Sequence, residues 1–259
     1  MTDISFLENG EDKWNENNKY YQLYLIYSVD CTVFYQFIYI VIALIGDKKK
    51  KLDTYEAKKL HKFAFIIAAR NEQAVIGNLI NSIKQQNYPA ELIDVIVVAD
   101  NCTDDTAQIA REHGAICYER FNNMLVGKGY ALDYCFNKIV EQFGDYTAYD
   151  GYFIFDADNV IDKNYVKEMN KVFDRGYNVI TSYRNSKNYD TNWITSGYSL
   201  WFIREAKYLN NPRMMLKTSC AVSGTGFFGK QLNYQEKQRL EVQPVNRRYS
   251  VFCCEHSRR

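Results

Sequence analysis

Two aspartates one residue apart follow a short run of aromatic and aliphatic residues. Asp156 and Asp158 come directly after residues 152–155, Tyr-Phe-Ile-Phe, which have the composition of a buried strand. Residues i and i+2 of a strand point to the same side, so both carboxylates can turn toward one divalent cation. Mg²⁺ and Mn²⁺ prefer oxygen ligands, and Mg²⁺ is commonly held by one or two carboxylates together with substrate phosphates. The spacing predicts a cation site that serves a nucleotide diphosphate, while an isolated Asp-x-Asp also occurs in solvated turns.

Further polar clusters follow other apolar runs of the chain. Ligands bind at the carboxyl ends of the strands of a parallel sheet, so these clusters are expected on the same rim as Asp156. Within the second cluster, Asp104 and Asp105 are better explained as helix-capping residues. The clusters are Arg70-Asn71-Glu72, Asp100 to Thr106, and Gly127-Lys128-Gly129.

The elements that must position these residues alternate between strands and helices. Continuous apolar runs indicate strands buried on both faces, and apolar residues at helical spacing lie between them. This alternation predicts an α/β domain with a mostly parallel sheet and helices on both faces. Strands are expected at 63–69, 93–99, 115–118, 152–156 and 178–183, with helices at 75–87, 103–111, 127–143 and 162–173.

The composition restricts the class of protein further. The 259 residues are 47% apolar, enough for one α/β domain and an appendage, and the net charge of +1 argues against a general nucleic-acid surface. The seven cysteines are scattered without a Cys-x-x-Cys pair, so neither a zinc site nor a disulfide framework is expected. A reducing compartment is the simpler expectation.

One segment departs from the soluble pattern. Leu23 to Ile45 carries a single charge, Asp30, and as a helix it would span about 35 Å, enough for a bilayer core. Four lysines, Lys48 to Lys51, follow it, and the residues before it are acidic. This asymmetry predicts a single-pass protein of the cell membrane with the large remainder in the cytoplasm. The alternative is a buried or interfacial helix, which is favoured by the polar residues Asp30 and Gln36 within the segment.

In their order along the chain, these clusters resemble the motifs of family 2 glycosyltransferases with the GT-A fold. The resemblance covers about residues 62–229. It is carried by Ala68-Ala69-Arg70-Asn71-Glu72, Asp100-Asn101-Cys102-Thr103-Asp104-Asp105-Thr106, Gly127-Lys128-Gly129-Tyr130-Ala131-Leu132, Asp156-Ala157-Asp158 and Ser223-Gly224-Thr225-Gly226-Phe227.

The resemblance implies a function and a role for each motif. It implies inverting, metal-assisted transfer of a sugar from a nucleotide diphosphate, with a UDP-sugar as donor and a saccharide or lipid-linked acceptor. Lys128 would lie near the diphosphate, and the first Asp of the second motif, Asp100, would read the uracil. It assigns nucleotide contacts to Ala68, Arg70, Glu72, Asp100, Lys128 and Asp156, the Mg²⁺ or Mn²⁺ ligands to Asp156 and Asp158, and the acceptor side to Gly224, Thr225 and Gly226.

Together these features divide the chain into five parts. The span and the lysine run also resemble the polysaccharide-making branch of the family. The predicted parts are an extracytoplasmic segment at 1–19, a transmembrane helix at 20–46, a basic juxtamembrane linker at 47–61, an incomplete GT-A domain at 62–230 and an atypical polar tail at 231–259.

The carboxyl half departs from the family pattern. The family supplies a Glu-Asp pair as catalytic base beyond the glycine-rich segment, and here no Asp follows Asp190. We therefore expect a truncated or frame-shifted product whose native-like sequence stops near Lys230. The alternative function is a non-catalytic, membrane-tethered remnant that binds a nucleotide sugar.

Two other enzyme classes fit the sequence less well. Residues 153–160 resemble the first motif of haloacid-dehalogenase-type phosphatases, but that family needs a further acidic pair downstream. A nucleotidyltransferase would need a glycine-rich phosphate loop after the first strand, which residues 69–72 do not supply. Trp193 and Trp201 are expected as core or membrane-interface residues, with sugar platforms as the alternative.

Overall fold

The computed structural model describes residue 20 and residues 34–46, 55–186, 191–218, 220–222, 224–230 and 251–254. The chain divides into two compact units, Met1–Lys50 and Lys51–Arg259. In the first unit, residues 34–46 are helical. Among the described residues, no helix combines the length and apolar character needed to cross a bilayer. Residues 21–33 of the predicted span lie outside the described part, so the transmembrane helix stays a prediction.

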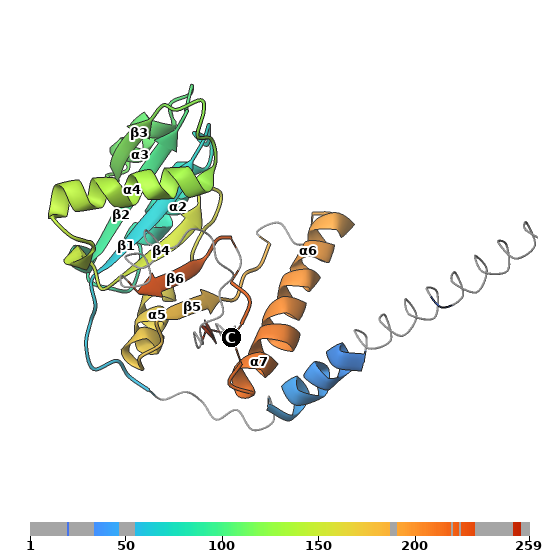
Figure 1. Cartoon of the computed structure of the whole chain (residues 1–259). Coiled ribbons are helices and arrows are strands. Elements are labelled where there is room, and N and C mark those ends of the chain that lie inside the picture. Colours follow the sequence, from blue (N-terminus) through green and yellow to red (C-terminus); the bar gives the residue numbers. More distant parts are fainter. Residues whose placement is uncertain are drawn as a thin grey trace, which may run out of the picture. The chain divides into compact units, whose positions relative to one another are not determined.

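The second unit is built on a mixed seven-stranded sheet with the order β3-β2-β1-β4-β6-β5-β7 (Figure 1). Four neighbouring strands are parallel: β3 (Ile116–Arg120), β2 (Ile93–Asp100), β1 (Phe63–Ala69) and β4 (Gly151–Asp156). The next strand, β6 (Phe227–Lys230), is antiparallel to both β4 and β5 (Val179–Ser182), and β7 (Val251–Cys254) is parallel to β5. The predicted α/β class and the mostly parallel sheet are confirmed, and β6 makes the sheet a mixed one.

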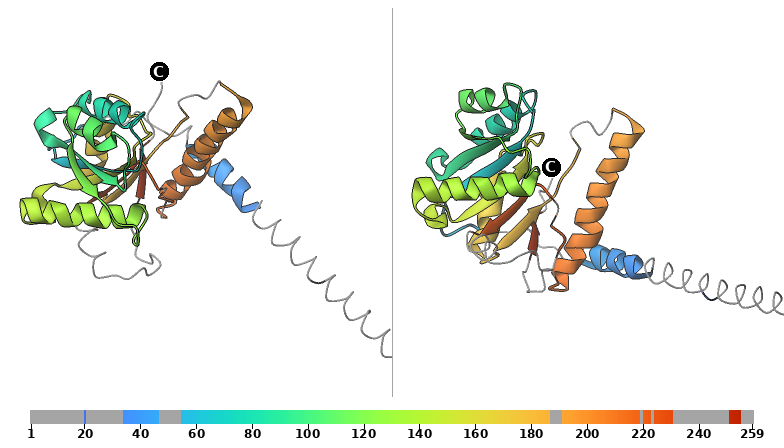
Figure 2. Two further views of the ribbon diagram at one scale, coloured as in Figure 1. Left: turned by 90° about the horizontal axis from the view of Figure 1, so that it is seen from above. Right: turned by 45° about the horizontal axis from the view of Figure 1, so that its top comes forward.

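Helices cover both faces of the parallel part, as the continuous apolar strands predict. Residues 63–67 of β1 are all 0% exposed, which requires packing on both sides. One face packs against α2 (Ile76–Lys84), α3 (Thr106–Glu112) and α5 (Tyr165–Asp174), and the other packs against α4 (Lys128–Phe143). Short 3₁₀ turns, η1 (Ala90–Leu92) and η2 (Tyr146–Ala148), precede β2 and β4. The two views of Figure 2 show α4 alone on its side of the drawn sheet.

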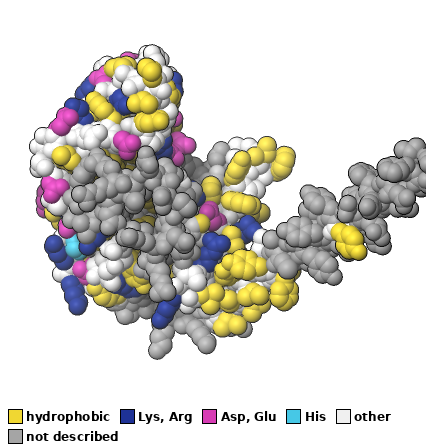
Figure 3. All heavy atoms as spheres, viewed as in Figure 1, with side chains coloured by type: hydrophobic (Ala, Val, Ile, Leu, Met, Phe, Trp, Pro, Cys, Tyr) yellow, Lys and Arg dark blue, Asp and Glu magenta, His cyan; other side chains and the backbone are white. Residues whose placement is uncertain are grey.

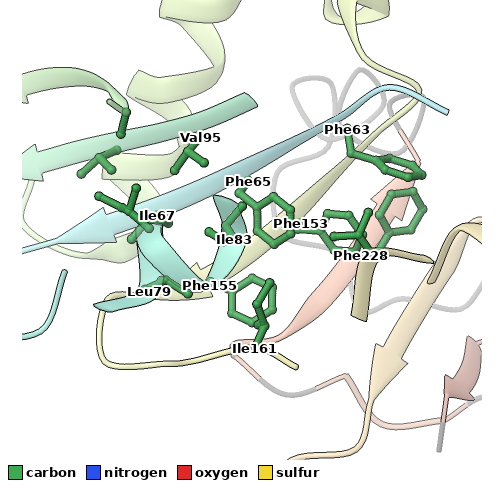
Figure 4. Close-up of a cluster of buried hydrophobic side chains, with 14 of the residues drawn as sticks. Phe63, Phe65, Ile67, Leu79, Ile83, Val95, Phe153, Phe155, Ile161 and Phe228 are labelled. Carbon is green, nitrogen blue, oxygen red and sulfur yellow. The ribbon is translucent and has the colours of Figure 1, made fainter. Parts of the chain in front are cut away.

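Phenylalanines from three central strands form the middle of the core (Figure 4). The rings of Phe65 and Phe153 stack with centroids 4.6 Å apart, and Phe228 lies 5.0 Å from Phe153. Phe63 meets Phe228 edge to face at 5.4 Å. Burying one such side chain stabilises the fold by about 1.5–3 kcal/mol. Because these rings join β1, β4 and β6, they fix the strands whose ends carry the polar clusters.

The predicted elements differ from the observed ones mainly at their ends. The strand predicted at 115–118 runs from Ile116 to Arg120, because pairing with β2 continues past the apolar residues. The helix predicted at 162–173 begins at Tyr165, after a turn in which the Tyr165 amide donates to the Asp162 carbonyl. No strand is predicted after 178–183, yet β6 pairs with β4 and β5, and β7 pairs with β5. The other residues of the predicted polar tail, 231–250 and 255–259, lie outside the described part, so its interpretation stays a prediction.

A long helical segment lies beside the sheet, near β5. It consists of α6 (Trp193–Ile203), the π-helix η3 (Arg204–Asn210) and α7 (Asn211–Met215). Asn192 caps α6, because its side chain accepts from the backbone of Ile194 and Thr195 at 3.0 Å. Trp193 and Trp201 are 83% and 58% exposed, which excludes core positions for them, while the expected membrane-interface position stays a prediction.

The described part of the predicted basic linker is bound to the domain. Tyr55 Oη donates to the Asp174 carboxylate at 2.6 Å, and the Lys58 amide donates to the same oxygen at 2.8 Å. His61 lies between two carboxylates, with Nδ1 3.5 Å from Asp150 and Nε2 3.6 Å from Asp174. Residues 55–61 therefore pack on α5 before the chain enters β1.

Candidate functional site

The ends of the parallel strands bring the predicted polar clusters to one rim of the sheet. In the register of the sheet, Ala68 of β1 lies beside Asp156 of β4, and Ala69 lies beside Ala99 of β2. Asp100, the last residue of β2, lies beside Arg120 of β3. Because β1 is the shared neighbour, the segments after β1, β2 and β4 begin next to one another.

The two aspartates of the Asp-x-Asp sequence leave the strand in a turn. The strand ends at Asp156, as the predicted strand at 152–156 does, and Asp158 lies in the following turn. Ala157 between them is 3% exposed, and both aspartates are more exposed than it is. Asn159 holds the turn, because its Nδ2 donates to the Asp156 carbonyl and to Asp158 Oδ1, each at 3.0 Å. The turn thus leaves both carboxylates more exposed than the buried Ala157 between them, which is the alternation expected from their i, i+2 spacing.

Lys128 reaches the first of these carboxylates from the start of α4. Its Nζ donates to Asp156 Oδ1 and to the Gly224 carbonyl oxygen, the latter at 2.5 Å. Gly127, the N-cap residue of α4, has a φ of 135°, a conformation that residues with a Cβ rarely adopt. The ammonium group therefore joins the Asp156 turn to the glycine-rich segment, and it places a positive charge at the rim.

The glycine-rich segment packs directly behind Asp156. Thr225 Oγ1 accepts the Asp156 amide at 2.9 Å and Asn159 Nδ2 at 3.3 Å, while the Gly226 amide donates to the Ile154 carbonyl at 2.9 Å. Residues 224–226, expected on the acceptor side, thus lie against the turn expected to hold the cation. A substrate bound at this turn would lie within reach of both segments.

Asp100 forms a buried ion pair that the sequence did not predict. Its carboxylate is engaged by Arg120 Nη1, and the two side chains are only 7% and 8% exposed. Arg120 Nη2 also donates to the Leu125 carbonyl at 2.7 Å, which ties the loop before α4 to the pair. A carboxylate offers about four lone-pair directions, so Asp100 retains acceptor capacity for a ring N–H beside the guanidinium.

Two asparagines with left-handed backbones connect the loops of the rim. Asn71 has φ 56° and Asn101 has φ 53°, a region that Asn tolerates better than most residues. The Asn71 side-chain oxygen accepts the Thr103 amide at 2.8 Å, and that of Asn101 accepts the Asn122 amide at 2.8 Å. The loops after β1, β2 and β3 are therefore linked in series.

Asp104 acts at the start of α3, as the sequence analysis favours. Its carboxylate accepts the Thr106 hydroxyl at 2.6 Å and the Thr106 amide at 3.1 Å, and it also accepts the Gln73 amide at 3.2 Å. Desolvation opposes its charge, but these hydrogen bonds outweigh that effect and hold the pKa of Asp104 below its ordinary value. Asp105 is the N-cap residue by backbone position and makes no side-chain cap hydrogen bond.

The remaining predicted nucleotide contacts also lie on this rim. Arg70 is exposed directly after β1, and Ala68 is half-buried within the strand. Glu72 is half-buried, its amide donates to Thr106 Oγ1 at 2.8 Å, and its carbonyl accepts the amides of Val75 and Ile76. The backbone of Glu72 thus joins the loops that precede α2 and α3.

The donor set at the Asp156 turn suits a hard divalent cation. Two carboxylates on one turn provide the oxygen ligands that Mg²⁺ and Mn²⁺ prefer, and substrate phosphates and water commonly complete such a shell. Over the part of the chain that the structure describes, no group of three or more His, Cys, Asp and Glu side chains gathers as a site.

Several rim residues were missed from the sequence. Arg120, Asn101 and Asn159 carry contacts that fix the site, as given above. The rule that polar residues at strand ends face the ligand would have found Arg120, because it ends β3. No comparable signal marks the asparagines, since the positive φ of Asn101 and the side-chain contacts of Asn159 depend on the path of the backbone.

Comparison with known proteins shows that the chain is similar to glycosyltransferases. A 4,4'-diaponeurosporenoate glycosyltransferase of Staphylococcus aureus (strain N315) is 46% identical over 74 residues, which are 28% of this chain and 19% of that protein. The chain therefore spans about a fifth of the length of the curated relative it matches. The solved mannosyltransferase PcManGT from Pyrobaculum calidifontis, in complex with GDP-Man and Mn²⁺, superposes with a TM-score of 0.56 at 14% identity. That match covers 86% of this chain and 64% of the other, and it shows a shared fold.

The sequence model of the family described as glycosyl transferase family 2 matches residues 64–234. This range is more than half of the 259 residues, and apart from Phe63, the first residue of β1, it contains every strand of the described sheet except β7. The chain belongs to glycosyl transferase family 2.

Proposed function

We propose that the rim binds a nucleotide-diphosphate sugar and that the protein transfers this sugar to a saccharide or lipid-linked acceptor. The observation that carries the proposal is the set of contacts made by Asp156. There a carboxylate, the Lys128 ammonium and the Thr225 hydroxyl meet at the end of β4. This arrangement combines a ligand for a cation, a charge for phosphates and a neighbouring segment for the acceptor.

The donor is a UDP-sugar in this proposal. Asp100 accepts the uracil ring N–H with the capacity that Arg120 leaves, while Ala68, Arg70 and Glu72 line the nucleoside side of the rim. The buried ion pair supports this role, because it holds the carboxylate in one orientation. Bidentate or fixed acceptors discriminate bases well, since a mismatched ring leaves a buried group without its hydrogen bond.

Asp156 and Asp158 hold Mg²⁺ or Mn²⁺ together with the diphosphate. The cation supplies charge neutralisation for the departing nucleotide diphosphate, and Lys128 adds a second positive charge there. The Mn²⁺ in the PcManGT complex supports a divalent cation for a protein of this fold. In this proposal the acceptor oxygen forms its bond to the anomeric carbon from the side of residues 224–226 while the bond from that carbon to the diphosphate breaks. This displacement inverts the configuration, and the hydroxyl proton passes to water.

The membrane is part of the proposal as well. Residues 20–46 would form a single transmembrane helix, with the sheet domain in the cytoplasm, as in the polysaccharide-making branch of the family. The apolar stretch and the lysines after it support this orientation. In the described part of this segment, Phe34, Phe37 and Leu44 are 69%, 60% and 51% exposed, which fits a lipid environment.

A second candidate function is binding without transfer. It is favoured by the sequence after Asp190, which contains no Asp and no Glu-Asp pair to deprotonate an acceptor. Such a protein would keep the Asp156 turn and Lys128 and hold a nucleotide sugar without turnover.

A two-part experiment tests the proposal and separates the candidates. Thermal unfolding is followed with UDP, GDP and ADP, each with and without Mn²⁺, and UDP release from a panel of UDP-sugars is then measured. Stabilisation by UDP with Mn²⁺ is expected, and UDP release would identify the transferase. Stabilisation without release would support the binding candidate, and stabilisation by GDP or ADP alone would contradict the assignment of Asp100.

A further inference from the structure

The loop that joins β3 to α4, residues 121–127, buries little apolar surface. Near the top of the view in Figure 3, hydrophobic side chains lie on the surface where Figure 1 draws β3. A segment with few buried apolar contacts is held only weakly by packing, so this loop depends on hydrogen bonds for its conformation. The exposed apolar residues of the loop are Phe121 (70%), Met124 (92%), Leu125 (46%) and Val126 (45%).

Side-chain hydrogen bonds fix this loop to the ends of β2 and β3. Asn101 Oδ1 accepts the Asn122 amide at 2.8 Å, and Asn101 Nδ2 donates to the Asn122 carbonyl at 3.1 Å. The Asn122 side-chain oxygen accepts the amides of Met124 and Leu125 at 2.9 and 2.8 Å. Arg120 Nη2 donates to the Leu125 carbonyl at 2.7 Å. The position of the loop is therefore set from the end of the rim that carries Asp100.

The same loop leads directly to the lysine at the other end of the rim. Only Val126 and Gly127 separate Leu125 from Lys128, the first residue of α4. Lys128 Nζ contacts the Asp156 carboxylate. Two intervening residues leave little slack in the chain, because each spans at most about 3.6 Å. A displacement of Leu125 is therefore passed on to the backbone that carries Lys128.

Direct contact does not link the two ends of the rim. Asp100 and Arg120 end β2 and β3, whereas Asp156 ends β4, and β1 lies between β2 and β4. With about 4.8 Å between neighbouring strands, the end of β3 lies about 14 Å from that of β4. The Arg120 side chain is 8% exposed and bound to Asp100, so it does not reach a phosphate beside Asp156. An effect of Arg120 on that phosphate has to pass through the loop.

We propose that Arg120 is a positioning residue that holds Lys128 in place for the diphosphate through loop 121–127, an inference that rests on the proposed function. One nitrogen of the guanidinium holds Asp100 and the other holds the loop. A base N–H that donates to Asp100 uses the remaining acceptor capacity of the carboxylate and keeps it in the orientation that holds Arg120. Recognition of the base thereby raises the affinity of the rim for the diphosphate.

The alternative role of Arg120 is neutralisation of Asp100 alone. The two roles differ for inorganic pyrophosphate, a ligand that has the phosphates but no base. Asp100→Asn removes a negative charge from the rim, so electrostatic attraction alone would raise the affinity for pyrophosphate. Under the positioning role the same substitution releases Arg120 and the loop, and the affinity for pyrophosphate falls.

Calorimetric titration of pyrophosphate with Mn²⁺ into the full chain tests the proposal, with UDP titrated in parallel. Arg120→Lys keeps the charge, but an ammonium group does not reproduce the guanidinium fork, so pyrophosphate affinity should fall about fivefold. Asp100→Asn should lower this affinity as well. Arg111→Lys is the matched control and should bind like the native chain. Arg111 Nη2 also contacts a carboxylate and a carbonyl, those of Glu119 at 2.5 Å and Cys117 at 3.5 Å.

A second set of variants changes the loop and leaves the buried ion pair intact. Asn122→Ala removes the oxygen that accepts two backbone amides of the loop, and it should lower pyrophosphate affinity about fivefold. Asn122→Asp keeps an acceptor oxygen at this position and should recover part of the loss. In a Lys128→Met background, Asn122→Ala should have no further effect, because the loop acts through Lys128.

The outcomes separate this inference from the proposed function. Circular dichroism identifies the variants that are folded, and Asn122→Ala decides if Arg120→Lys does not fold. Pyrophosphate binding that is unchanged in the folded variants would overturn the positioning role, even if UDP binding falls. An equal effect of Asn122→Ala with and without Lys128 would overturn it as well. If the native chain binds neither UDP nor pyrophosphate, the proposed donor site fails, and this inference fails with it.

Discussion

The contact between Lys128 and Asp156 places an ammonium group where a cation would bind. Without a metal ion, Lys128 neutralises the carboxylate and holds the Gly224 carbonyl at 2.5 Å. If the proposed function holds, the Lys128 ammonium would compete with a free cation for Asp156, and it would assist the nucleotide by moving to the phosphates, which carry more negative charge.

Replacing Lys128 separates these two effects. In Lys128→Met, the Mn²⁺ dissociation constant without nucleotide should fall by up to about fivefold, the worth of a partly exposed ion pair. UDP affinity in the presence of Mn²⁺ should fall instead. Calorimetry measures both, with Lys138→Met on the same helix as control. Weaker Mn²⁺ binding by Lys128→Met would contradict competition at Asp156.

The buried pair of Asp100 and Arg120 should be costly to break. In Arg120→Met the carboxylate would remain buried without its partner, and the free energy of unfolding should fall by about 3–5 kcal/mol. Urea denaturation measures this change. The double variant Asp100→Asn with Arg120→Met should recover part of the loss, because no buried charge is left. If the single variant is as stable as the native chain, the pair does not stabilise the rim.

At the scale of the elements, the close approach of β4 and β6 depends on a glycine. A Cβ added at Gly151 would lie 2.2 Å from Phe228 Cζ and 3.1 Å from the Gly229 carbonyl. Gly151→Ala should therefore lower the free energy of unfolding by about 1–3 kcal/mol through overpacking. Gly197→Ala, on α6, meets nothing within 4 Å and should be neutral or stabilising. Equal stability of the two variants would show that β6 can shift at little cost.

The attachment of residues 55–61 to α5 should depend on pH. The Tyr55 hydroxyl and the Lys58 amide lower the pKa of Asp174 below its ordinary value. A carboxyl group with a depressed pKa stabilises the fold above its unfolded pKa of about 3.9, and this contribution is lost as the pH falls through the lower folded value. The difference in urea midpoint between the native chain and Asp174→Asn should therefore be present at neutral pH and vanish in acid. A difference that grows in acid would contradict this role.

Elements that are stabilised by their own hydrophobic pattern can be predicted from the sequence, and elements that depend on tertiary contacts cannot. Strand β1 and helix α2 show continuous or periodic apolar residues, so hydrophobic patterning alone locates them. The pairing of β7 with β5 and the outward position of Trp193 depend on tertiary contacts that no local pattern records. In the candidate site, residue type singles out Asp156, Asp158 and the polar clusters that contain Lys128, Asn71 and Asn101. The ion pair of Arg120 and the left-handed backbones of Asn71 and Asn101 depend instead on the path of the backbone.

For the molecule as a whole, the proposed function assigns separate roles to two parts of the chain. The rim would bind the nucleotide sugar, and residues 20–46 would anchor the chain. These proposed properties are physically separate, since one depends on carboxylates and the other on an apolar segment. Each can therefore be removed by substitution without removing the other.

The measurement that tests the central claim most directly is calorimetric titration of UDP into the full chain with Mn²⁺. The account predicts binding that requires Mn²⁺ and that is lost in Asp158→Ala, while Glu141→Gln, an exposed acid near the end of α4, binds like the native chain. Circular dichroism confirms that each variant is folded. Binding without metal, binding unchanged in Asp158→Ala, or no binding by the folded native chain would contradict the assignment of the rim as a metal-assisted donor site.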